Sequence, residues 1–336
     1  MNKILVIRFD ALGDTILTLP FLDALRKEYP DAEITVIASP IGAPPLLNVP
    51  WLDVKIIDRT DRFQIEYIID YIRTCGFDIS FNVSEKIEGY EIPFQAKIPV
   101  RVGFDPGFSQ FFKSVLVKRY CTHPVSYSNS PSSPQGLHEV ERQFLLLRKY
   151  GIERLTLPCT ITIPQEDDIW AKDYIKTYIK KQGYLLVLHL SNKWIAGVWD
   201  EAFLLHLIEQ IAKEYRHIVL SYGPSEKSLA EALAKQIDNP NLTFFFDPFF
   251  NHWAAILKYA KCVITMDTSA SHVAAGVSTP SVVVFNDKYF EHTVERWHPW
   301  MVKYRAIKRN IANKASGKEL VNNIVAGLKF CLRTGN

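Results

Sequence analysis

The sequence predicts an α/β protein made of two doubly wound parallel sheets, one in each half of the chain, with a cleft between the halves. The chain has 336 residues, which exceeds the ~100–200 residues of a typical domain. Residues 3–9 (KILVIRF) form a nearly continuous apolar run, as expected of a parallel strand covered on both faces. Such runs alternate with helical patterns, and the alternation begins again at residues 184–190.

The first half begins with a predicted βαβ unit. The strand at 3–9 leads into a turn containing Gly13, a helical pattern at 16–26 and a second strand at 33–39. Pro20 falls inside the helical pattern, where it predicts a kink. Further strands are predicted at 54–58, 77–83 and 99–103, and helices at 63–74 and from 138 to a C-cap at Gly151.

The segment 104–135 is less regular than its neighbours. It contains FFKSVLVKRY and then a run rich in Ser and Pro, which predicts a loop. The loop is interpreted either as a mobile segment that carries Lys113, Lys118 and Arg119 toward an acceptor, or as an ordinary surface loop.

The second half repeats the alternation of the first. A helix at 169–181 is predicted to lead into it. Predicted strands follow at 184–190, 217–221, 242–246, just before Asp267, and 281–285, and predicted helices at 201–214, 227–236, 252–260 and about 318–332. The predicted division is a first domain of residues 1–165, a second of residues 166–315, and a C-terminal helical segment of residues 316–336.

The composition is typical of a globular protein and argues against a membrane-spanning or disulfide-rich one. Hydrophobic residues make up 48% and charged residues 22% of the chain, as in ordinary globular proteins. No apolar run approaches the ~20 residues that span a bilayer, and MNKILVIRFD is interpreted as a strand rather than a targeting segment, so a cytoplasmic protein is expected. The five cysteines form no C-x-x-C pair, which argues against a zinc ribbon or a disulfide framework.

Positive charge gathers near the C-terminus. The formal net charge is only +3, yet residues 301–336 contain eight Lys or Arg residues and one acidic residue. Such a tail is interpreted either as a solvated helix face or as a surface that meets an anionic partner, membrane lipid or nucleic acid.

The segment 262–280 (CVITMDTSASHVAAGVSTP) predicts a buried strand, an acidic turn and a helix rich in small residues. The first turn of a helix offers unpaired N–H groups and the positive end of the helix dipole, which suit a diphosphate. Asp267 could accept hydrogen bonds from sugar hydroxyls, while Thr268, Ser269 and His272 would lie at the helix start. The alternative is that these residues only cap the helix.

Three turns at predicted strand ends indicate one site: residues 10–14, 189–193 and 267–272. A carboxylate such as Asp14 could deprotonate an acceptor hydroxyl, and Lys193 could neutralise a departing diphosphate. The structural alternatives are an N-cap for Asp14, a surface lysine for Lys193 and a packed core histidine for His272.

Several cofactor motifs are missing from the sequence. There is no D-x-D triplet, which predicts that a sugar-nucleotide enzyme of this kind needs no bound metal. There is also no G-x-G-x-x-G after the first strand and no G-x-x-x-x-G-K-[ST], so dinucleotide redox chemistry and P-loop hydrolysis are not expected.

Four segments resemble one family of enzymes. They are ILVIRFDALGDTILTLPFLDALRKEYPDAEITVIA, HEVERQFLLLRKYG, YGPSEKSLAEALA and CVITMDTSASHVAAGVSTPSVVVF. Their order and content are similar to glycosyltransferase family 9, the ADP-heptose:lipopolysaccharide heptosyltransferases. The resemblance implies a GT-B architecture with an N-terminal acceptor domain, a C-terminal donor domain and a last helix that returns to the first domain.

The resemblance also implies roles for single residues. Asp14 matches the catalytic base and Asp267 the residue that holds the donor sugar, while Thr268, Ser269 and His272 match the donor-phosphate segment. The complete set of candidates is Asp14 and Lys193 as catalytic residues; Gly223, Glu226, Ser191 and the four residues from the 267–272 segment for the donor; and Asp10, Gly13, Lys113 and Arg119 for the acceptor. Counted back from Trp199, the family lysine falls on Gly197, so Lys193 either takes that role through a local shift or the role is vacant.

The predicted function is an inverting, metal-independent transfer of a heptose or related sugar from an ADP-sugar to a lipopolysaccharide-core or similar glycan acceptor. No cofactor is expected, since the ADP-sugar is a substrate. The predicted partners are the donor, the glycan or glycolipid acceptor and an anionic membrane surface, but not nucleic acid. Two alternatives stay open: a sugar-nucleotide epimerase of similar fold, and a binding scaffold that has lost activity, which the unusual residues Ser269, Gly197 and Asn286 would fit.

Overall fold

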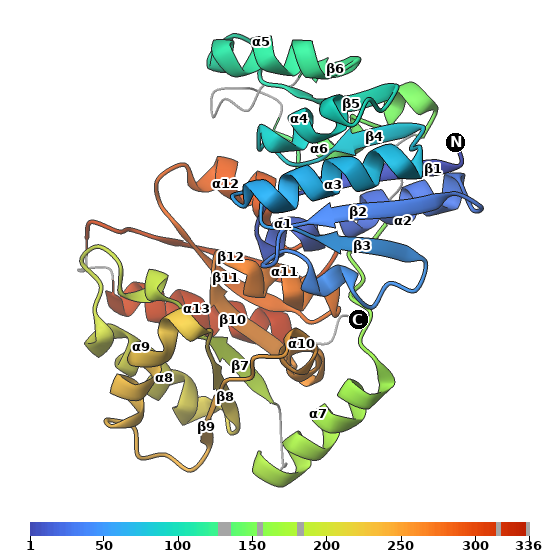
Figure 1. Cartoon of the computed structure of the whole chain (residues 1–336). Helices are drawn as coiled ribbons and strands as arrows, with labels where there is room; N and C mark the ends of the chain where they lie inside the picture. The colour runs from blue at the N-terminus through green and yellow to red at the C-terminus, as the bar shows by residue number, and fades with distance from the viewer. Residues whose placement is uncertain (127–135, 153–156, 180–184, 314–316, 334–336) are drawn as a thin grey trace. The chain divides into compact units, whose positions relative to one another are not determined.

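The chain folds into two compact units, Met1–Thr162 and Ile163–Asn336, in the computed structural model (Figure 1). The structure describes residues 1–126, 136–152, 157–179, 185–313 and 317–333. Each unit contains one six-stranded parallel sheet flanked by helices, so the predicted α/β class with two doubly wound domains is confirmed. The division between the units falls three residues before the predicted boundary at 165/166.

The first unit has the strand order β3-β2-β1-β4-β5-β6, with every neighbouring pair parallel. Its strands are β1 Lys3–Arg8, β2 Glu33–Ala38, β3 Leu52–Ile56, β4 Ile79–Asn82, β5 Val100–Asp105 and β6 His123–Ser126. Its α-helices are α1 Leu12–Ile16, α2 Leu19–Glu28, α3 Arg62–Cys75, α4 Glu88–Gln95, α5 Phe111–Tyr120 and α6 Glu139–Phe144. Short 3₁₀ turns lie at Pro44–Leu46, Gly107–Gln110 and Arg148–Tyr150.

Side chains of β1 alternate between two covered faces of the sheet. Leu5 and Ile7 join a hydrophobic cluster with Ile68 and Ile72 of α3, and this burial on both faces explains the nearly continuous apolar run of the strand. The predicted helix at 16–26 is divided: α1 ends at Ile16 and α2 begins at Leu19, with Pro20 in its first turn. Proline is tolerated there because the first N–H groups of a helix have no partner inside the helix.

The second unit repeats this arrangement with the order β12-β11-β10-β7-β8-β9, again parallel throughout. Its strands are β7 Leu186–His189, β8 Ile218–Ser221, β9 Leu242–Phe245, β10 Cys262–Met266, β11 Ser281–Asn286 and β12 Tyr304–Arg309. Its α-helices are α7 Gln165–Tyr178, α8 Glu201–Glu214, α9 Lys227–Ala234, α10 Phe250–Tyr259, α11 Ser269–Gly276, α12 Phe290–Trp297 and α13 Gly317–Leu332. Two 3₁₀ turns, η4 Asn192–Ile195 and η5 Pro224–Glu226, follow β7 and β8.

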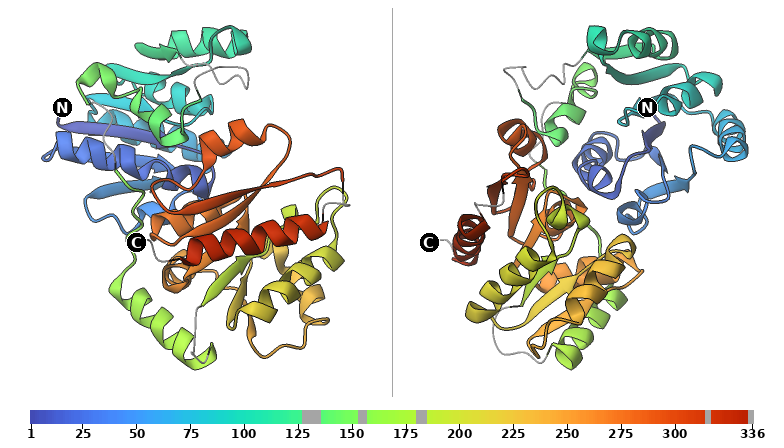
Figure 2. Two further views of the ribbon diagram at one scale, coloured as in Figure 1. Left: turned by 180° about the vertical axis from the view of Figure 1, so that it is seen from behind. Right: turned by 90° about the vertical axis from the view of Figure 1, so that its left-hand side faces the viewer.

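Two features of the second unit were not expected from the sequence. Residues 304–309 form the edge strand β12, which was not predicted because basic side chains interrupt its apolar pattern. The last helix, α13, packs against β11 and β12 of its own unit, as Figure 2 shows, and buries Leu320, Ile324 and Leu328 there. The implied return of this helix to the first domain stays a prediction.

The prediction of a loop for residues 104–135 is also wrong in part. Residues 111–120 form the helix α5, and only the segment 127–135 lies outside the described residues. The helix packs through Val117, which joins a small cluster with Tyr90 and Cys121. No described helix is both long enough and apolar enough to cross a membrane.

Candidate active site

Both sheets change the direction of strand order at their centre, and most of the predicted site residues lie in the loops there. In the first unit the change falls between β1 and β4, and in the second between β7 and β10. Loops at the carboxyl ends of such strand pairs leave a crevice in which doubly wound proteins bind ligands. Each unit therefore has its own candidate ligand site, formed by the loops after its two central strands.

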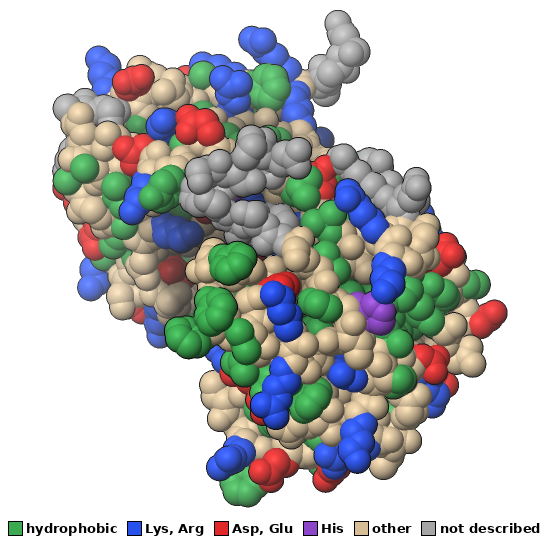
Figure 3. Space-filling model, turned by 90° about the horizontal axis from the view of Figure 1, so that it is seen from above, with side chains coloured by type: hydrophobic (Ala, Val, Ile, Leu, Met, Phe, Trp, Pro, Cys, Tyr) green, Lys and Arg blue, Asp and Glu red, His purple; other side chains and the backbone are tan. Residues whose placement is uncertain are grey.

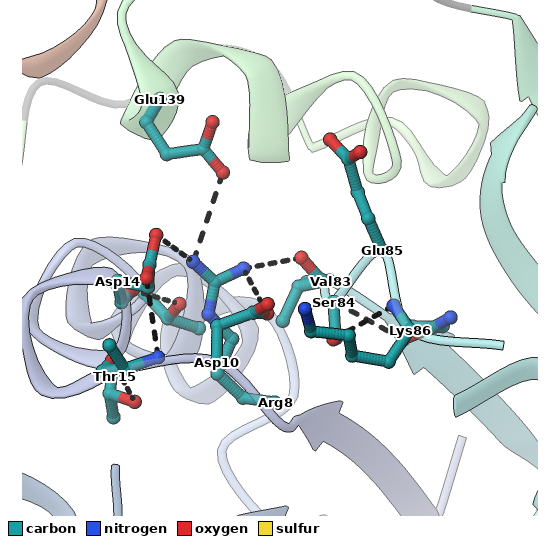
Figure 4. A network of polar contacts seen from close by, with 12 residues as sticks. Arg8, Asp10, Asp14, Thr15, Val83, Ser84, Glu85, Lys86 and Glu139 are labelled. Atoms are coloured by element: carbon teal, nitrogen blue, oxygen red, sulfur yellow. Dashed lines mark hydrogen bonds and ion pairs between the residues drawn. The ribbon is translucent and has the colours of Figure 1, made fainter. Parts of the chain in front are cut away.

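Arg8, the last residue of β1, organises the site of the first unit (Figure 4). Its side chain is only 2% exposed, and its guanidinium donates to the backbone carbonyl of Val83 just after β4. It also lies 3.2 Å from Asp14 Oδ1, 3.6 Å from Asp10 Oδ2 and 3.9 Å from Glu139 Oε1. One buried cation thus holds three carboxylates, which come from the β1 loop, α1 and α6.

Asp14 is the most exposed of the carboxylates around Arg8, with 25% of its side chain accessible. Burial raises the pKa of Asp14; the charge of Arg8 opposes that rise, and the nearby charges of Asp10 and Glu139 add to it. Oδ2 of Asp14 also accepts a hydrogen bond from the Ala11 N–H at 3.3 Å. A carboxylate with a raised pKa and partial access to solvent is suited to accept a proton from a hydroxyl group.

A chain of charged side chains continues from Glu139. Arg142 donates two hydrogen bonds to the Glu139 carboxylate, at 2.9 and 2.7 Å, and its Nη1 lies 3.1 Å from Glu85. Lys113 of α5 lies 3.9 Å from Glu85 and lines a small cleft with Glu85 and Arg142. The charged network therefore reaches from Asp14 to Lys113 within the first unit.

The predicted acceptor residues are only partly brought together. Asp10 and Lys113 belong to this network, and Gly13 lies within α1, where its carbonyl accepts from the Leu17 N–H. Arg119 is exposed on α5, and no described contact joins it to the network. Sequence reasoning missed Arg8, although an arginine inside the apolar strand KILVIRF was a usable signal.

The segment 262–276 of the second unit has the predicted strand–turn–helix structure. β10 is fully buried, Thr268 is the N-cap of α11, and its hydroxyl accepts from the Ala270 N–H at 3.3 Å. Asp267, Thr268 and Ser269 are partly exposed at the helix start, whereas His272 is buried one turn further along. The capping alternative is thus confirmed for Thr268, while Asp267 and Ser269 stay accessible to a ligand.

Lys193 joins the two central loops of the second unit. Its ammonium group donates to the backbone carbonyl of Asp267, across the ends of β7 and β10. Burial raises the pKa of Asp267, and the charge of Lys193 opposes that rise. His189 is partly exposed at the end of β7, and desolvation lowers its pKa to about 4, so at neutral pH Lys193 supplies the positive charge of this loop.

Gly197 does not have room for a side chain. Its φ is +73°, and a Cβ atom there would lie 2.4 Å from the backbone oxygen of Ile311. The position that matches the family lysine by counting is therefore closed, while Lys193 lies beside the carbonyl of Asp267.

The other predicted donor residues lie around η4 and η5. Asn192 donates to the Ser225 carbonyl at 3.1 Å and to Glu226 Oε1 at 3.3 Å, so it connects the loops after β7 and β8. Gly223 precedes η5, and a Cβ atom there would lie 3.1 Å from Glu226. Ser191 caps η4 by accepting from the Lys193 N–H at 3.2 Å, so its hydroxyl has a structural role.

Arg309 supports η4 from the edge of the sheet. It is 1% exposed, donates to the Trp194 carbonyl at 3.1 Å and reaches Asn286 Oδ1 at 2.9 Å. The basic tail is therefore not uniformly available to an anionic surface: Arg309 is buried, and Lys308 and Lys329 lie 3.5 and 2.8 Å from Glu291 and Glu214. Lys314 lies outside the described residues.

No group of three or more His, Cys, Asp or Glu side chains in the described residues is placed to hold a metal ion. Metal-independent chemistry stays a prediction.

Comparison with known proteins agrees with the resemblance seen in the sequence. Residues 67–323 match the model for "Glycosyltransferase family 9 (heptosyltransferase)". A lipopolysaccharide heptosyltransferase 3 of Escherichia coli is 24% identical over 302 residues, which cover 86% of this chain and 83% of that protein.

Solved structures show the same fold. The glycosyl transferase family 9 protein from Veillonella parvula has a TM-score of 0.80 at 16% identity, covering 98% of this chain and 97% of its own. An Escherichia coli heptosyltransferase with ADP-2-deoxy-2-fluoro heptose has a TM-score of 0.70 at 16% identity, covering 98% and 99%. The two-domain α/β architecture of this chain is thus that of GT-B heptosyltransferases.

Proposed function

The chain belongs to glycosyltransferase family 9, and we propose that it transfers a heptose or a related sugar from an ADP-sugar to a lipopolysaccharide-core or similar glycan acceptor. The observation that carries this proposal is the pair of central-strand sites: a carboxylate of raised pKa at one and a lysine beside a helix N-terminus at the other. These are the groups needed to activate a hydroxyl and to hold a diphosphate. We propose that the enzyme works in the cytoplasm.

In the proposed reaction Asp14 acts as the general base. Its carboxylate takes the proton of the acceptor hydroxyl while that oxygen forms a bond to the anomeric carbon of the donor sugar. The bond between this carbon and the diphosphate breaks, its electron pair leaves with ADP, and the configuration of the sugar is inverted. Arg8 keeps Asp14 in place through a contact of 3.2 Å and opposes the rise in its pKa, so the carboxylate is ionised over a wider pH range.

In the second unit the proposal assigns one part of the donor to each loop. Asp267 accepts hydrogen bonds from hydroxyls of the sugar, since its carboxylate lies beside the start of α11 and is partly exposed. Lys193 and the N–H groups of the first turn of α11 stabilise the diphosphate as negative charge develops on it. Glu226, held by Asn192, accepts from the ribose hydroxyls.

The direct test is a transfer assay on the purified chain. ADP-heptose is the first donor to try, because a structural neighbour was solved with a fluorinated analogue of it, and UDP- and GDP-sugars serve as comparison. A thermal-shift screen ranks the donors, since a bound ligand stabilises the native state by mass action. The proposal expects ADP release that depends on a lipid-free core oligosaccharide, with a new glycosidic linkage seen by NMR.

The same assay separates the alternatives. An epimerase would convert the donor with no acceptor present, which NMR of donor and protein alone would reveal. A binding scaffold would bind the donor in calorimetry and release no ADP with any acceptor. Either outcome would overturn the proposal.

A further inference from the structure

The outer face of α5 exposes large apolar side chains that the proposed chemistry does not use. Phe108, just before the helix, is 94% exposed, and Phe111 and Phe112 are 56% and 86% exposed. Val115 and Leu116 are also exposed, so the apolar surface runs along the helix. Soluble proteins rarely expose several large apolar residues side by side, and such patches mark sites of contact with a partner or a membrane.

Most of the large apolar side chains of α5 face outward, which is the reverse of the arrangement in an ordinary surface helix. Phe111 and Val115 form one row at a spacing of four residues, Phe112 and Leu116 form the adjacent row, and Arg119 extends the first. The buried side carries Ser114 and Val117. A surface helix usually turns its apolar stripe toward the core, whereas the apolar arc of α5 faces away from the described core of its own unit.

The charged side chains of α5 are all basic: residues 107–120 contain Lys113, Lys118 and Arg119 and no acidic residue. Lys113 lies 3.9 Å from Glu85 and Lys118 lies 3.5 Å from Asp105. Arg119 is exposed at the C-terminal end of the helix, beside the apolar rows, and is the basic residue of this face with no described acidic neighbour. Figure 3 looks onto the side of the molecule that carries α5, where hydrophobic and basic side chains share the surface.

We propose that the α5 face, defined as Phe108, Phe111, Phe112, Val115, Leu116 and Arg119, docks onto the surface of an anionic lipid bilayer. The phenyl rings enter the boundary between headgroups and acyl chains, and the basic residues contact anionic headgroups. Neither signal alone gives stable attachment in general, whereas apolar insertion combined with basic charge does.

The bilayer explains these observations better than a protein partner. A symmetric pairing of two α5 faces would offer Arg119 no acidic partner from the facing helix, because residues 107–120 contain no acidic residue. The basic C-terminal tail is a weaker candidate for this docking, because Arg309 is buried and, among the described residues of the tail, Met301 and Phe330 are the only exposed large apolar side chains. The docking inference goes beyond the proposed transfer reaction and does not depend on it.

The test is co-sedimentation of the full chain with vesicles. One vesicle preparation contains phosphatidylcholine alone, and the other contains phosphatidylcholine mixed with phosphatidylglycerol. The variant Phe108→Ser/Phe112→Ser removes two exposed rings, and Arg119→Gln removes one charge. Phe63→Ser is the matched control, because Phe63 is 84% exposed on α3 of the same unit and lies outside the α5 face.

The proposal expects binding to the anionic vesicles that weakens as salt is raised. The double Phe variant should reduce partitioning at least about tenfold, since each ring gives up the transfer free energy of several carbon atoms. Arg119→Gln should reduce it less, and Phe63→Ser should leave it unchanged. Circular dichroism and transfer to a lipid-free acceptor should be unaltered in the double Phe variant.

Other outcomes would overturn the docking inference. These are absence of vesicle binding by the unmodified chain, equal losses in the Phe63 and double Phe variants, or a concentration-dependent dimer that only the double Phe variant abolishes. Vesicle binding without any transferase activity would leave the docking inference standing and overturn the proposed function alone.

Discussion

The guanidinium of Arg8 lies 3.2 Å from Asp14 Oδ1 and also donates to the carbonyl of Val83 (Figure 4). A single buried side chain therefore positions the proposed base and joins the loops after the two central strands of the first sheet. Lys193 makes the corresponding connection in the second sheet, from the loop after β7 to the carbonyl of Asp267. In each unit a cation thus connects the loops after the two central strands, the place where doubly wound sheets bind ligands.

Replacing Asp14 by Asn should remove the base while preserving the shape of the side chain. We expect turnover to fall by about 10²–10⁴-fold, the usual contribution of a general base, with little change in donor affinity. Steady-state transfer assays and calorimetry with ADP-heptose measure the two quantities. Asp31→Asn, at an exposed position, is the control. Unchanged turnover in Asp14→Asn would show that another group takes the proton.

The pH dependence of transfer should follow the pKa of Asp14, which the charge of Arg8 influences. Burial raises the pKa of Asp14 and Arg8 opposes that rise, so transfer should decline as pH falls through this raised pKa. Arg8→Gln removes the opposing charge and should move the acidic limb of the kcat/KM profile to higher pH, while Arg8→Lys should move it back. The profile is measured at pH values where circular dichroism shows a folded variant. An acidic limb that stays in place would contradict the pairing.

The stability of the protein should depend on pH through Asp267. Because burial raises its folded pKa above the unfolded value of about 3.9, the folded state binds this proton more tightly. The stabilisation is full below the unfolded pKa and is lost as pH rises through the folded pKa. Asp267→Asn should thus gain thermal stability relative to the unmodified chain between pH 4 and pH 8, measured without donor. A constant difference in melting temperature over this range would contradict the assignment.

Local patterns in the sequence predicted the strand, turn and helix of residues 262–276 well. The apolar run ending at Met266, the cap at Thr268 and the small residues of α11 each follow from propensities that act within a few positions. The two sheets were predictable for the same reason, since their central strands are apolar on both faces.

Contacts distant in sequence were the part that local patterns could not predict. Arg8 meets Glu139 only because α6 returns to the end of β1, and Arg309 meets Asn286 and the Trp194 carbonyl only once β12 pairs with β11. The helix α5 was missed for a different reason: its apolar residues face outward, so its pattern does not resemble that of a helix packed on a core.

Substitutions at positions 193 and 197 test which of the two supplies the lysine of the proposed diphosphate site. Lys193→Met removes a charged donor from the proposed diphosphate site and should lower kcat/KM for the donor by about 10- to 100-fold. Gly197→Lys should not compensate, because a Cβ there would lie 2.4 Å from the Ile311 oxygen and the φ of +73° disfavours any side chain. The double variant Lys193→Met/Gly197→Lys should therefore be less stable and no more active than Lys193→Met. Recovery of activity in the double variant would show that the lysine role belongs to position 197.

Arg309 should be a residue on which the stability of the second unit depends. Arg309 is 1% exposed, and its guanidinium donates hydrogen bonds to Asn286 Oδ1, at 2.9 Å, and to the Trp194 carbonyl, at 3.1 Å. Arg309→Met would remove the donor to the buried Trp194 carbonyl and to the partly buried Asn286 amide oxygen, and we expect the free energy of unfolding to fall by roughly 2–4 kcal/mol. Arg305→Met on the same strand is the control, because Arg305 is exposed and should cost far less.

Because the Trp194 carbonyl belongs to η4, which also carries Lys193, the loss of Arg309 should weaken donor binding as well as stability. Urea unfolding and calorimetry with ADP-heptose measure the two effects. Equal stabilities of the Arg309→Met and Arg305→Met variants would contradict the structural role of Arg309. Unchanged donor affinity in Arg309→Met would show that η4 keeps its position without this support, so that Lys193 is held in place by its contact with the Asp267 carbonyl alone.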